Sequence, residues 1–277
     1  MTNRKRFVGL AIAATIVAAM AGSSTPVAHA QTAAKSTLDK ILEKKELRVG
    51  MTLQFKPEMY KDDAGKPAGY DVEVLNLLAA DLGVKLTISD LDFDGLIPGL
   101  LADKFDMVSV GLVGRPKRLT TMYFTDSYVP YEQVLAVPNK STRAANIGAF
   151  NKAGTTLTAL QGSTAEGQIK TSFPLATAKS FPQQDAAFLE VSSGRADGIV
   201  VERYLVTQFQ KTNPGKLKIV ELKPALNIEY GQWAIPKGDY DFLVYLNNWL
   251  KYYKNNGKLE EIYGRTIAPV GQIWPRQ

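Results

Sequence analysis

Hydrophobic residues recur along this chain with two alternating spacings. Intervals of three and four residues, typical of a helix with one buried face, predict helices at 37–45, 70–82, 94–102, 185–192, 204–211 and 240–254. Short apolar runs predict strands at 47–50, 85–88, 105–110, 131–137, 155–160 and 198–201. Strands that alternate with helices in this way predict an α/β fold whose sheets are covered by helices.

The stretch from Asp94 to Tyr128 combines a helix, a buried strand and a basic loop. The predicted strand 105–110 delivers the chain to Gly111 at its carboxyl end, where open α/β sheets hold their ligands. Pro116 suits the first turn of a short helix that follows, because its missing N–H is not needed there. An arginine in that turn can hold a carboxylate through two parallel hydrogen bonds. The alternative is that the basic residues of the RPKR segment decorate a solvated loop.

The first 30 residues have the composition of a secretory signal peptide. Residues 4–6 are basic, residues 7–21 form an apolar core, and residues 28–30 are an Ala-His-Ala cleavage site. The rival interpretation is a transmembrane anchor, but the apolar run is shorter than the roughly 20 residues that a bilayer needs. The absence of cysteine excludes a lipid anchor. We therefore expect a free periplasmic protein of a Gram-negative bacterium that begins near residue 31.

Charge and composition exclude several classes of function. Three of the 33 Lys and Arg residues lie in the predicted leader, so 30 basic residues face 27 acidic ones and the net charge falls from +6 to +3. This charge gives little support to nucleic-acid binding. The single histidine, His29, also lies in the leader, so the mature chain lacks the His and Cys residues of most hydrolase triads and zinc sites. We expect neither a metal nor a cofactor.

Four motifs in a fixed order resemble a known family. They are GYDVEVLNLLAADLG at 69–83, LIPGLLADKFDM at 96–107, RPKR with YFTDSY at 115–128, and YLNNWLKYYKNNGKLEEIYGR at 245–265. This order is similar to that of the family 3 periplasmic solute-binding proteins, the amino-acid receptors of ABC importers. Their pattern is roughly L-I-P-x-L, K-x-D, a Ser/Thr-rich loop, T-P-E-R and F-S/T-x-P-Y. By this resemblance, Arg118 is the arginine that grips the ligand's α-carboxylate.

The resemblance also implies which residues of the first half surround the ligand. The family has an acidic residue and an aromatic ring in the loop after its first strand; the corresponding positions are Thr52 and Phe55, so the ring is retained and the acid is lost. Phe93 occupies a position where the family often packs an aromatic residue against the ligand, and Phe55 and Phe93 are expected to form an aromatic clamp. The alternative for Phe55 is a core position. Val113 replaces a Ser or Thr of the family's carboxylate loop.

In the second half, the segment QGSTAE at 161–166 predicts a glycine turn and the start of a capped helix. In the family, the hydroxyl residue at the position of Thr164 contacts the carboxylate that the arginine holds, whereas ordinary N-capping explains Ser163 equally well. Glu202 lies five residues beyond Asp197 of the GRAD motif, where the family has an aspartate that binds the α-ammonium. Alternatively, Glu202 is a helix-start acid that the macrodipole favours.

The family resemblance predicts two α/β lobes joined by two crossing strands, with a ligand cleft between them. Lobe 1 is expected at 36–134 and 233–277 and lobe 2 at 137–229. Binding should close the hinge, because Arg118 lies on lobe 1 and Thr164 and Glu202 lie on lobe 2. The expected function is a monomeric receptor that delivers a small ligand to the membrane permease of an ABC importer, without catalysis.

The identity of the ligand stays open between a polar or mildly apolar amino acid and a related carboxylate. Thr52 in place of an acid argues against a cationic side chain, since a buried cation needs a counter-charge. Arg115, next to Pro116, is expected to be exposed to solvent. Two alternatives remain: a periplasmic dehydratase on the same fold, with Glu202 as general acid, and a sensory module that presents its closed form to a membrane kinase.

Overall fold

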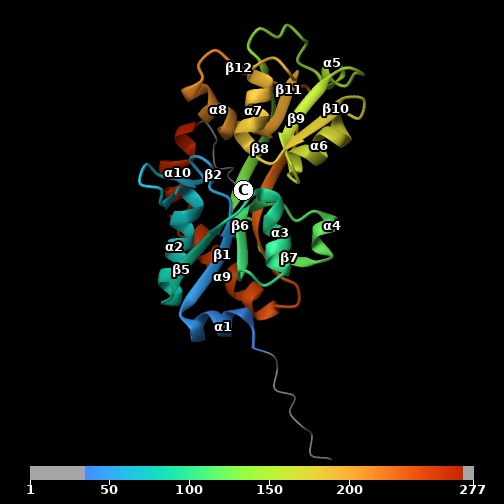
Figure 1. Cartoon of the computed structure of the whole chain (residues 1–277). Helices are drawn as coiled ribbons and strands as arrows, with labels where there is room; N and C mark the ends of the chain where they lie inside the picture. The colour runs from blue at the N-terminus through green and yellow to red at the C-terminus, as the bar shows by residue number, and fades with distance from the viewer. Residues whose placement is uncertain (1–34, 271–277) are drawn as a thin grey trace, which may run out of the picture. The chain divides into compact units, whose positions relative to one another are not determined.

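The computed structural model describes residues 35–270 of the 277-residue chain (Figure 1). The predicted signal peptide lies outside the described residues. In chain order the elements are α1 (Thr37–Lys44), β1 (Glu46–Met51), β2 (Gln54–Phe55), β3 (Met59–Lys61), β4 (Pro67–Ala68), α2 (Tyr70–Leu82), β5 (Lys85–Asp90), α3 (Phe93–Leu101), β6 (Met107–Leu112), α4 (Pro116–Leu119), β7 (Met122–Phe124), β8 (Val129–Pro138), α5 (Ile147–Phe150), β9 (Thr156–Leu160), α6 (Thr164–Ser172), β10 (Thr177–Phe181), α7 (Gln184–Ser192), β11 (Gly198–Glu202), α8 (Arg203–Thr212), β12 (Leu217–Val220), β13 (Ile228–Pro236), α9 (Tyr240–Asn255), α10 (Lys258–Thr266) and the 3-10 turn η1 (Ala268–Val270).

The described strands form one ten-stranded mixed sheet and one small sheet. The large sheet has the order β10-β9-β11-β8-β13-β6-β1-β5, with β12 paired to β8 and β7 paired to β13, and the small sheet is β2-β3-β4. The strands β10-β9-β11 are mutually parallel, and so are β6-β1-β5, whereas β8 and β13 are antiparallel to their neighbours. The predicted α/β class is thus confirmed.

The strands β8 and β13 connect these two parallel units. Residues 129–132 of β8 pair with residues 228–231 of β13. The remainder of β8 pairs with β11 and β12, and the remainder of β13 pairs with β6 and β7. The chain therefore passes from a first half, built around β6-β1-β5, to a second half, built around β10-β9-β11, through β8, and it returns through β13 (Figure 1). The residue boundaries given above for the lobes remain a prediction.

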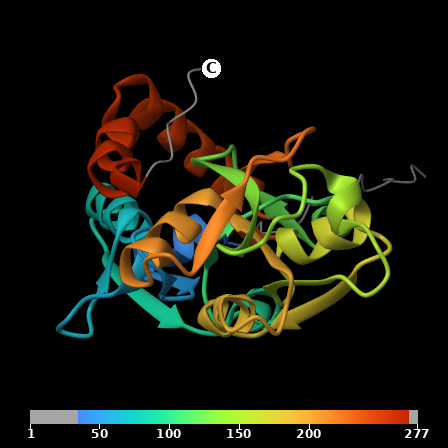
Figure 2. The ribbon, with the colours of Figure 1, turned by 90° about the horizontal axis from the view of Figure 1, so that it is seen from above.

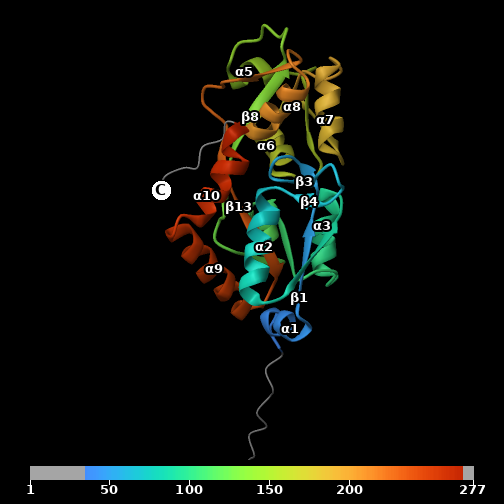
Figure 3. The ribbon, with the colours of Figure 1, turned by 90° about the vertical axis from the view of Figure 1, so that its left-hand side faces the viewer.

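Helices cover the sheet in both halves. In the first half α2 contacts β5 and α3 contacts β1, and Figure 3 shows these helices on opposite sides of β1. The C-terminal helices, red in Figure 2, lie beside α2, and α10 contacts it. The second half has a smaller apolar core of its own, which includes Leu157, Phe173 and Val200. Among residues 35–270, no helix is long and apolar enough to cross a membrane.

Several local predictions are confirmed because they depend on neighbouring residues alone. The helix α2 has the predicted bounds, and Gly83 ends it in the left-handed conformation. Ser36 caps α1 in a capping box with Asp39. Pro116 occupies the first turn of α4, where no N–H is required.

The strand β6 begins two residues later than predicted, at Met107. Phe105 lies outside the strand, and its ring fills a slot beside Gly50 and Gly99, where added Cβ atoms would lie 2.5 and 2.6 Å from the ring. The following residue, Asp106, accepts a hydrogen bond from the backbone N–H of Arg48 through its side chain, at 2.8 Å. Side-chain packing therefore delays the start of the strand.

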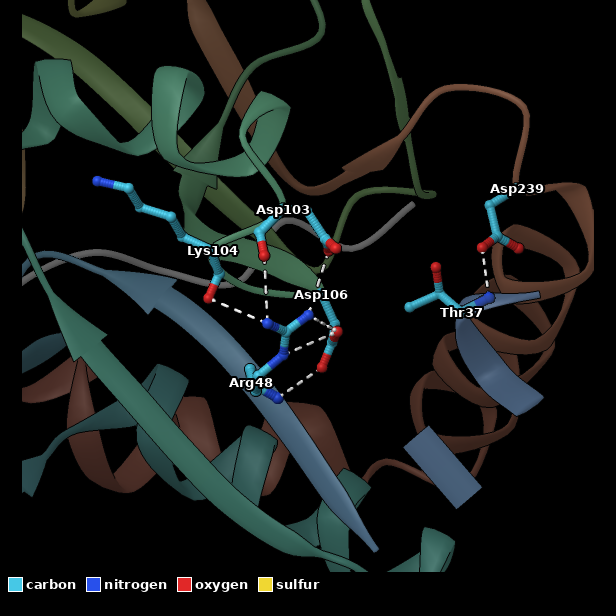
Figure 4. A network of polar contacts seen from close by, with 6 residues as sticks. All are labelled: Thr37, Arg48, Asp103, Lys104, Asp106 and Asp239. Carbon is cyan, nitrogen blue, oxygen red and sulfur yellow. Dashed lines mark hydrogen bonds and ion pairs between the residues drawn. The ribbon is translucent and has the colours of Figure 1, made fainter. Parts of the chain in front are cut away.

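A polar network at this point fixes β1 against the start of β6 (Figure 4). The guanidinium of Arg48 donates to Asp106 at 2.7 and 3.2 Å and to the carboxylate of Asp103 at 3.2 Å. The side chain of Asp106 is 8% exposed, whereas that of Asp103 is 86% exposed. Figure 4 also shows a separate contact, in which the backbone N–H of Thr37 donates to Asp239 at 2.6 Å and ties α1 to the start of α9.

We expect Asp106→Ala to lower the free energy of unfolding by roughly 1–3 kcal/mol, because it leaves the backbone N–H and the guanidinium of Arg48 without their buried acceptor. Urea denaturation monitored by circular dichroism measures this change. The matched control is Asp103→Asn, which keeps a residue that tolerates the positive φ of 54° at this position. The ion pair between Arg48 and the exposed Asp103, which the control removes, should contribute less than about 1 kcal/mol to the free energy of unfolding. Equal losses in the two variants would contradict the assignment.

Candidate functional site

A cavity lies where the two halves meet at β8 and β13. Its walls come from β6, α3, α4 and the β2–β3 segment in the first half, from β9, α6, α7, β11 and α8 in the second half, and from the connecting strand β8. The cavity volume is about 30 Å³, which is room for roughly one or two water molecules. An amino acid is larger, so entry of such a ligand requires the walls to separate. The cavity is lined by Phe55, Glu58, Phe93, Val110, Gly111, Leu112, Val113, Arg118, Tyr131, Leu160, Ser163, Thr164, Ala165, Gln184, Val200, Val201, Glu202 and Tyr204.

Arg118 extends from α4 to the cavity. Its guanidinium donates to the backbone carbonyls of Val113, at 3.0 Å, and of Gly162, at 2.9 Å. Burial and the neighbouring Arg115 lower the pKa of Arg118 to about 10, so the group stays charged near neutral pH. Within residues 35–270 no carboxylate lies within ion-pair distance of it. A largely desolvated cation held only by carbonyl dipoles is suited to receive an anion.

Ser163 and Thr164 lie at the N-terminus of α6 and have different surroundings. The hydroxyl of Ser163 caps the helix: it accepts from the N–H of Glu166 at 3.2 Å and donates to the carbonyl of Leu160 at 2.8 Å. Thr164 is 7% exposed and lines the cavity, next to the positive end of the helix dipole. Because Ser163 is engaged in capping, Thr164 is the better placed hydroxyl for a ligand.

Glu202 faces the cavity from the carboxyl end of β11. Its carboxylate accepts from the amide of Gln133, on β8, at 2.8 Å. Burial raises the pKa of Glu202, although hydrogen bonds from its own backbone and from Gln133 act in the opposite direction. Glu202 is thus a buried acid on the same cavity as the basic Arg118.

The aromatic residues Phe55 and Phe93 contact each other beside the cavity. Their ring centroids are 6.4 Å apart and their planes are inclined at 56°. This distance is within the range of a favourable aromatic pair. Both rings line the cavity, and Phe55 also belongs to the buried core, so the clamp around a ligand stays a prediction.

Gly111 and Val113 have backbone roles next to the cavity. Gly111 has a φ of +58°, and a Cβ there would lie 1.8 Å from the hydroxyl oxygen of Tyr131, so only glycine fits. The N–H of Gly111 donates to the hydroxyl of Tyr128 at 3.0 Å and is therefore already engaged. The carbonyl of Val113 holds Arg118. These contacts position the arginine even though residue 113 has no hydroxyl.

Thr52 is not among the residues that line the cavity. It is fully buried, and its hydroxyl accepts from the amide of Gln54 at 2.8 Å. The nearby acid that lines the cavity is instead Glu58, which is not among the residues predicted from the motifs. The signal was present, because Glu58 is the first acidic residue after the predicted strand 47–50 and lies in the loop that carries Phe55.

Glu58 is 1% exposed, and its carboxyl group accepts hydrogen bonds from the hydroxyls of Tyr131 and Tyr204. Burial and then repulsion from Asp71 raise its pKa well above the usual range, against the effect of the two tyrosine hydroxyls, and Glu202 adds a smaller repulsion. Burial therefore shifts Glu58 toward its neutral form.

Arg115 corrects one expectation, since it is not a freely solvated side chain. Its guanidinium donates to the carbonyl of Thr164 at 2.9 Å and lies 3.6 Å from the carboxylate of Glu229. Its side chain is 33% exposed.

Gln184 is a further cavity residue that the motifs do not indicate. It is 3% exposed, lines the cavity and has an amide nitrogen without a hydrogen-bond partner among the described residues. The described residues contain no acidic, His or Cys cluster that suits a metal.

Known proteins match this chain along most of its length. An L-arginine-binding protein of Pseudomonas aeruginosa is 26% identical over 231 residues, with 81% of this chain and 88% of the relative covered. A cyclohexadienyl dehydratase of the same species is 25% identical over 230 residues, with 83% and 85% covered. The crystal structure of an ancestral amino-acid-binding protein, AncCDT-1, described as a precursor of cyclohexadienyl dehydratase, is 32% identical with a TM-score of 0.77, and 84% of this chain and 100% of that chain are covered.

The sequence model of the bacterial extracellular solute-binding proteins, family 3, matches residues 47–268. This range includes β1 through α10, and the fold is that of periplasmic amino-acid-binding proteins of type II. The resemblance that the four motifs carry is thereby confirmed. This chain belongs to the bacterial extracellular solute-binding proteins, family 3.

Proposed function

We propose that this protein is the periplasmic receptor of an ABC importer for an amino acid. Arg118 and Thr164 would hold the α-carboxylate, Glu202 would hold the α-ammonium, and Phe55 with Phe93 would contact the side chain. The observation that carries the proposal is the pairing of opposite charges on one small cavity, with Arg118 bound only to backbone carbonyls. An α-amino acid presents the complementary pair of charges.

Hinge closure fits the positions of these groups. Arg118 belongs to the first half, whereas Thr164 and Glu202 belong to the second half, and the halves are connected by β8 and β13. A change in the backbone angles of these two strands would open the cavity and admit the ligand. The closed form would then be presented to the membrane permease, with no bond made or broken.

The acid Glu58 changes the expectation for the ligand's side chain. The argument against a positively charged side chain rested on Thr52, but Glu58 supplies a carboxyl group to the cavity wall. A cation beside Glu58 would favour its ionised form and would be held by it. We therefore propose a polar or positively charged side chain, in line with the names of several relatives.

A thermal-shift screen over the twenty L-amino acids tests this function. An amino acid at 100 times its dissociation constant should stabilise the folded protein by about 2.7 kcal/mol, which gives a measurable rise in melting temperature. The control is a screen of the α-hydroxy acids with the same side chains, which lack the ammonium that Glu202 would bind. A screen in which no amino acid raises the melting temperature would contradict the proposal.

Catalysis is the second candidate, and two buried acids with raised pKa on one cavity, Glu58 and Glu202, favour it. A carboxyl group whose pKa is raised by burial can act as a general acid, and one relative is named a cyclohexadienyl dehydratase. We expect incubation with arogenate or prephenate to leave both compounds unchanged, as measured by the absorbance of the aromatic product. A steady rate that Glu202→Gln or Glu58→Gln removes would overturn this expectation and identify an enzyme.

A further inference from the structure

Arg115 spans the two halves without lining the cavity. It precedes α4 in the first half, yet its guanidinium reaches the first residue of α6, in the second half, and bonds the carbonyl of Thr164 at 2.9 Å. The same nitrogen lies 3.6 Å from the carboxylate of Glu229, on the connecting strand β13. The side chain of Glu229 is 16% exposed. One side chain thus joins the first half, the second half and the connection between them.

The surface of α6 is shaped to admit this guanidinium. Gly167 lies in the middle of the helix, where glycine is disfavoured relative to alanine. A Cβ at that position would lie 2.2 Å from a terminal nitrogen of Arg115. Packing against Arg115 therefore explains a glycine at this position, since the guanidinium occupies the space that a methyl group would fill.

Other contacts between the halves are more exposed or belong to the binding site. Gln161 donates to Asp94 at 3.1 Å, but both side chains lie at the surface. Arg118 bonds the carbonyl of Gly162, but its guanidinium also lines the cavity. Arg115 is a charged, partly desolvated donor that does not line the cavity.

We propose that Arg115 is a latch: it stabilises the closed arrangement of the two halves through Thr164, Gly167 and Glu229, and so strengthens binding without touching the bound molecule. The effect on closure stands by itself, whereas the effect on affinity rests on the proposed receptor function. In closing, the latch brings Thr164 to the cavity that Arg118 also lines, so Arg115 is a positioning residue. A binding-competent closed form that is more populated gives a tighter apparent affinity.

The absence of cysteine allows a direct test. Lys104→Cys and Lys152→Cys, at exposed positions in the first and second halves, accept a pair of fluorescent dyes for energy-transfer measurements on the protein without any amino acid. We expect Arg115→Gln to lower the ratio of closed to open molecules about tenfold, as the loss of a charged hydrogen bond predicts. Gly167→Ala should have the same effect by displacing the guanidinium, while the helix itself tolerates alanine well.

Two controls separate a latch from a structural role. Lys117→Gln removes a charge from the same segment at an exposed position and should leave the energy transfer unchanged. Arg115→Lys keeps the charge but loses the planar fork, and should give an intermediate ratio. Each amino acid that shifts the melting temperature of the unmodified protein is then titrated calorimetrically, and the dissociation constant should rise about tenfold in Arg115→Gln and Gly167→Ala.

The outcomes are distinguishable from those of the receptor function. Energy transfer that is the same in Arg115→Gln, Gly167→Ala and the unmodified protein would overturn the latch, whether or not an amino acid binds. An opening caused by Gly167→Ala alone would also overturn it, because the added methyl group would then act without the arginine. A protein that binds no amino acid but opens in both variants would retain the latch and contradict the receptor.

Discussion

Arg118→Ala is expected to abolish the stabilisation of this protein by every amino acid that stabilises the unmodified form. The dissociation constant should rise at least about 30-fold, because truncating one partner of a buried, hydrogen-bonded charge pair costs roughly 2–5 kcal/mol. Isothermal titration calorimetry measures the loss directly. The fold should persist, since Arg118 bonds only the carbonyls of Val113 and Gly162 in the described chain and is not part of an apolar core.

Two matched variants give this result its meaning. Arg118→Lys retains the positive charge but not the two parallel donors, so it should recover part of the affinity. Lys117→Ala changes the adjacent exposed residue and should bind as the unmodified protein does. An affinity that is unchanged in Arg118→Ala would remove this residue from the site and with it the proposed recognition of a carboxylate.

Asp71→Asn is expected to raise the free energy of unfolding at pH 8 while leaving it nearly unchanged at pH 4. Asp71 is fully buried at the start of α2, and one of its oxygens accepts from Tyr128 at 2.6 Å and from Ser109 at 2.7 Å. The other oxygen has no hydrogen-bond partner among the described residues. Burial raises the pKa of Asp71 to about 7, in spite of the two hydroxyl donors.

The sign of the effect follows from proton linkage. Between an unfolded pKa near 3.8 and a folded pKa of about 7, the folded protein holds a proton that the unfolded chain has released. The contribution of Asp71 to the free energy of unfolding is therefore fully present below pH 3.8, declines as the pH rises and is lost above about pH 7. Glu58, whose pKa is also raised, acts in the same direction. The asparagine imitates the neutral acid at every pH.

The expected gain at pH 8 is at most about 4 kcal/mol, because the pKa of Asp71 differs by about three units between the unfolded and folded protein and one unit corresponds to about 1.4 kcal/mol. Urea denaturation at a series of pH values from 4 to 8 gives the difference between the two proteins. Subtracting one curve from the other cancels the carboxylates with lowered pKa, such as Glu166 and Glu221, which act oppositely. Asp63→Asn, at an exposed position, is the control. A difference that does not vary with pH would contradict the assignment.

Elements and caps were predictable wherever the signal is local. The helix α2, the cap of α6 at Ser163 and the proline of α4 each depend on residues within a few positions of one another, so the pattern of the sequence was sufficient. The start of β6 was not predictable from neighbouring residues. Phe105 packs beside Gly50, which is 55 positions away by residue number, and the side chain of Asp106 accepts a hydrogen bond from the backbone of Arg48.

The residues around the cavity divide in the same way. Arg118, Thr164, Glu202 and the two phenylalanines were identified from motifs whose spacing the chain preserves, and all of them line one cavity. Whether they bind a ligand stays a prediction. Glu58 was missed because its surroundings come from Tyr131 and Tyr204, which are 73 and 146 positions away.

The sequence by itself determined the alternation of strands and helices, the helix caps and the order of the family's motifs, since these depend on short-range spacing and residue type. Only the tertiary structure decided that Glu58 is a buried acid on the cavity wall, that Thr52 lies off it, and that Arg115 reaches α6. Burial, pKa and the reach of a charged side chain are set by residues that are distant in the chain and close in space.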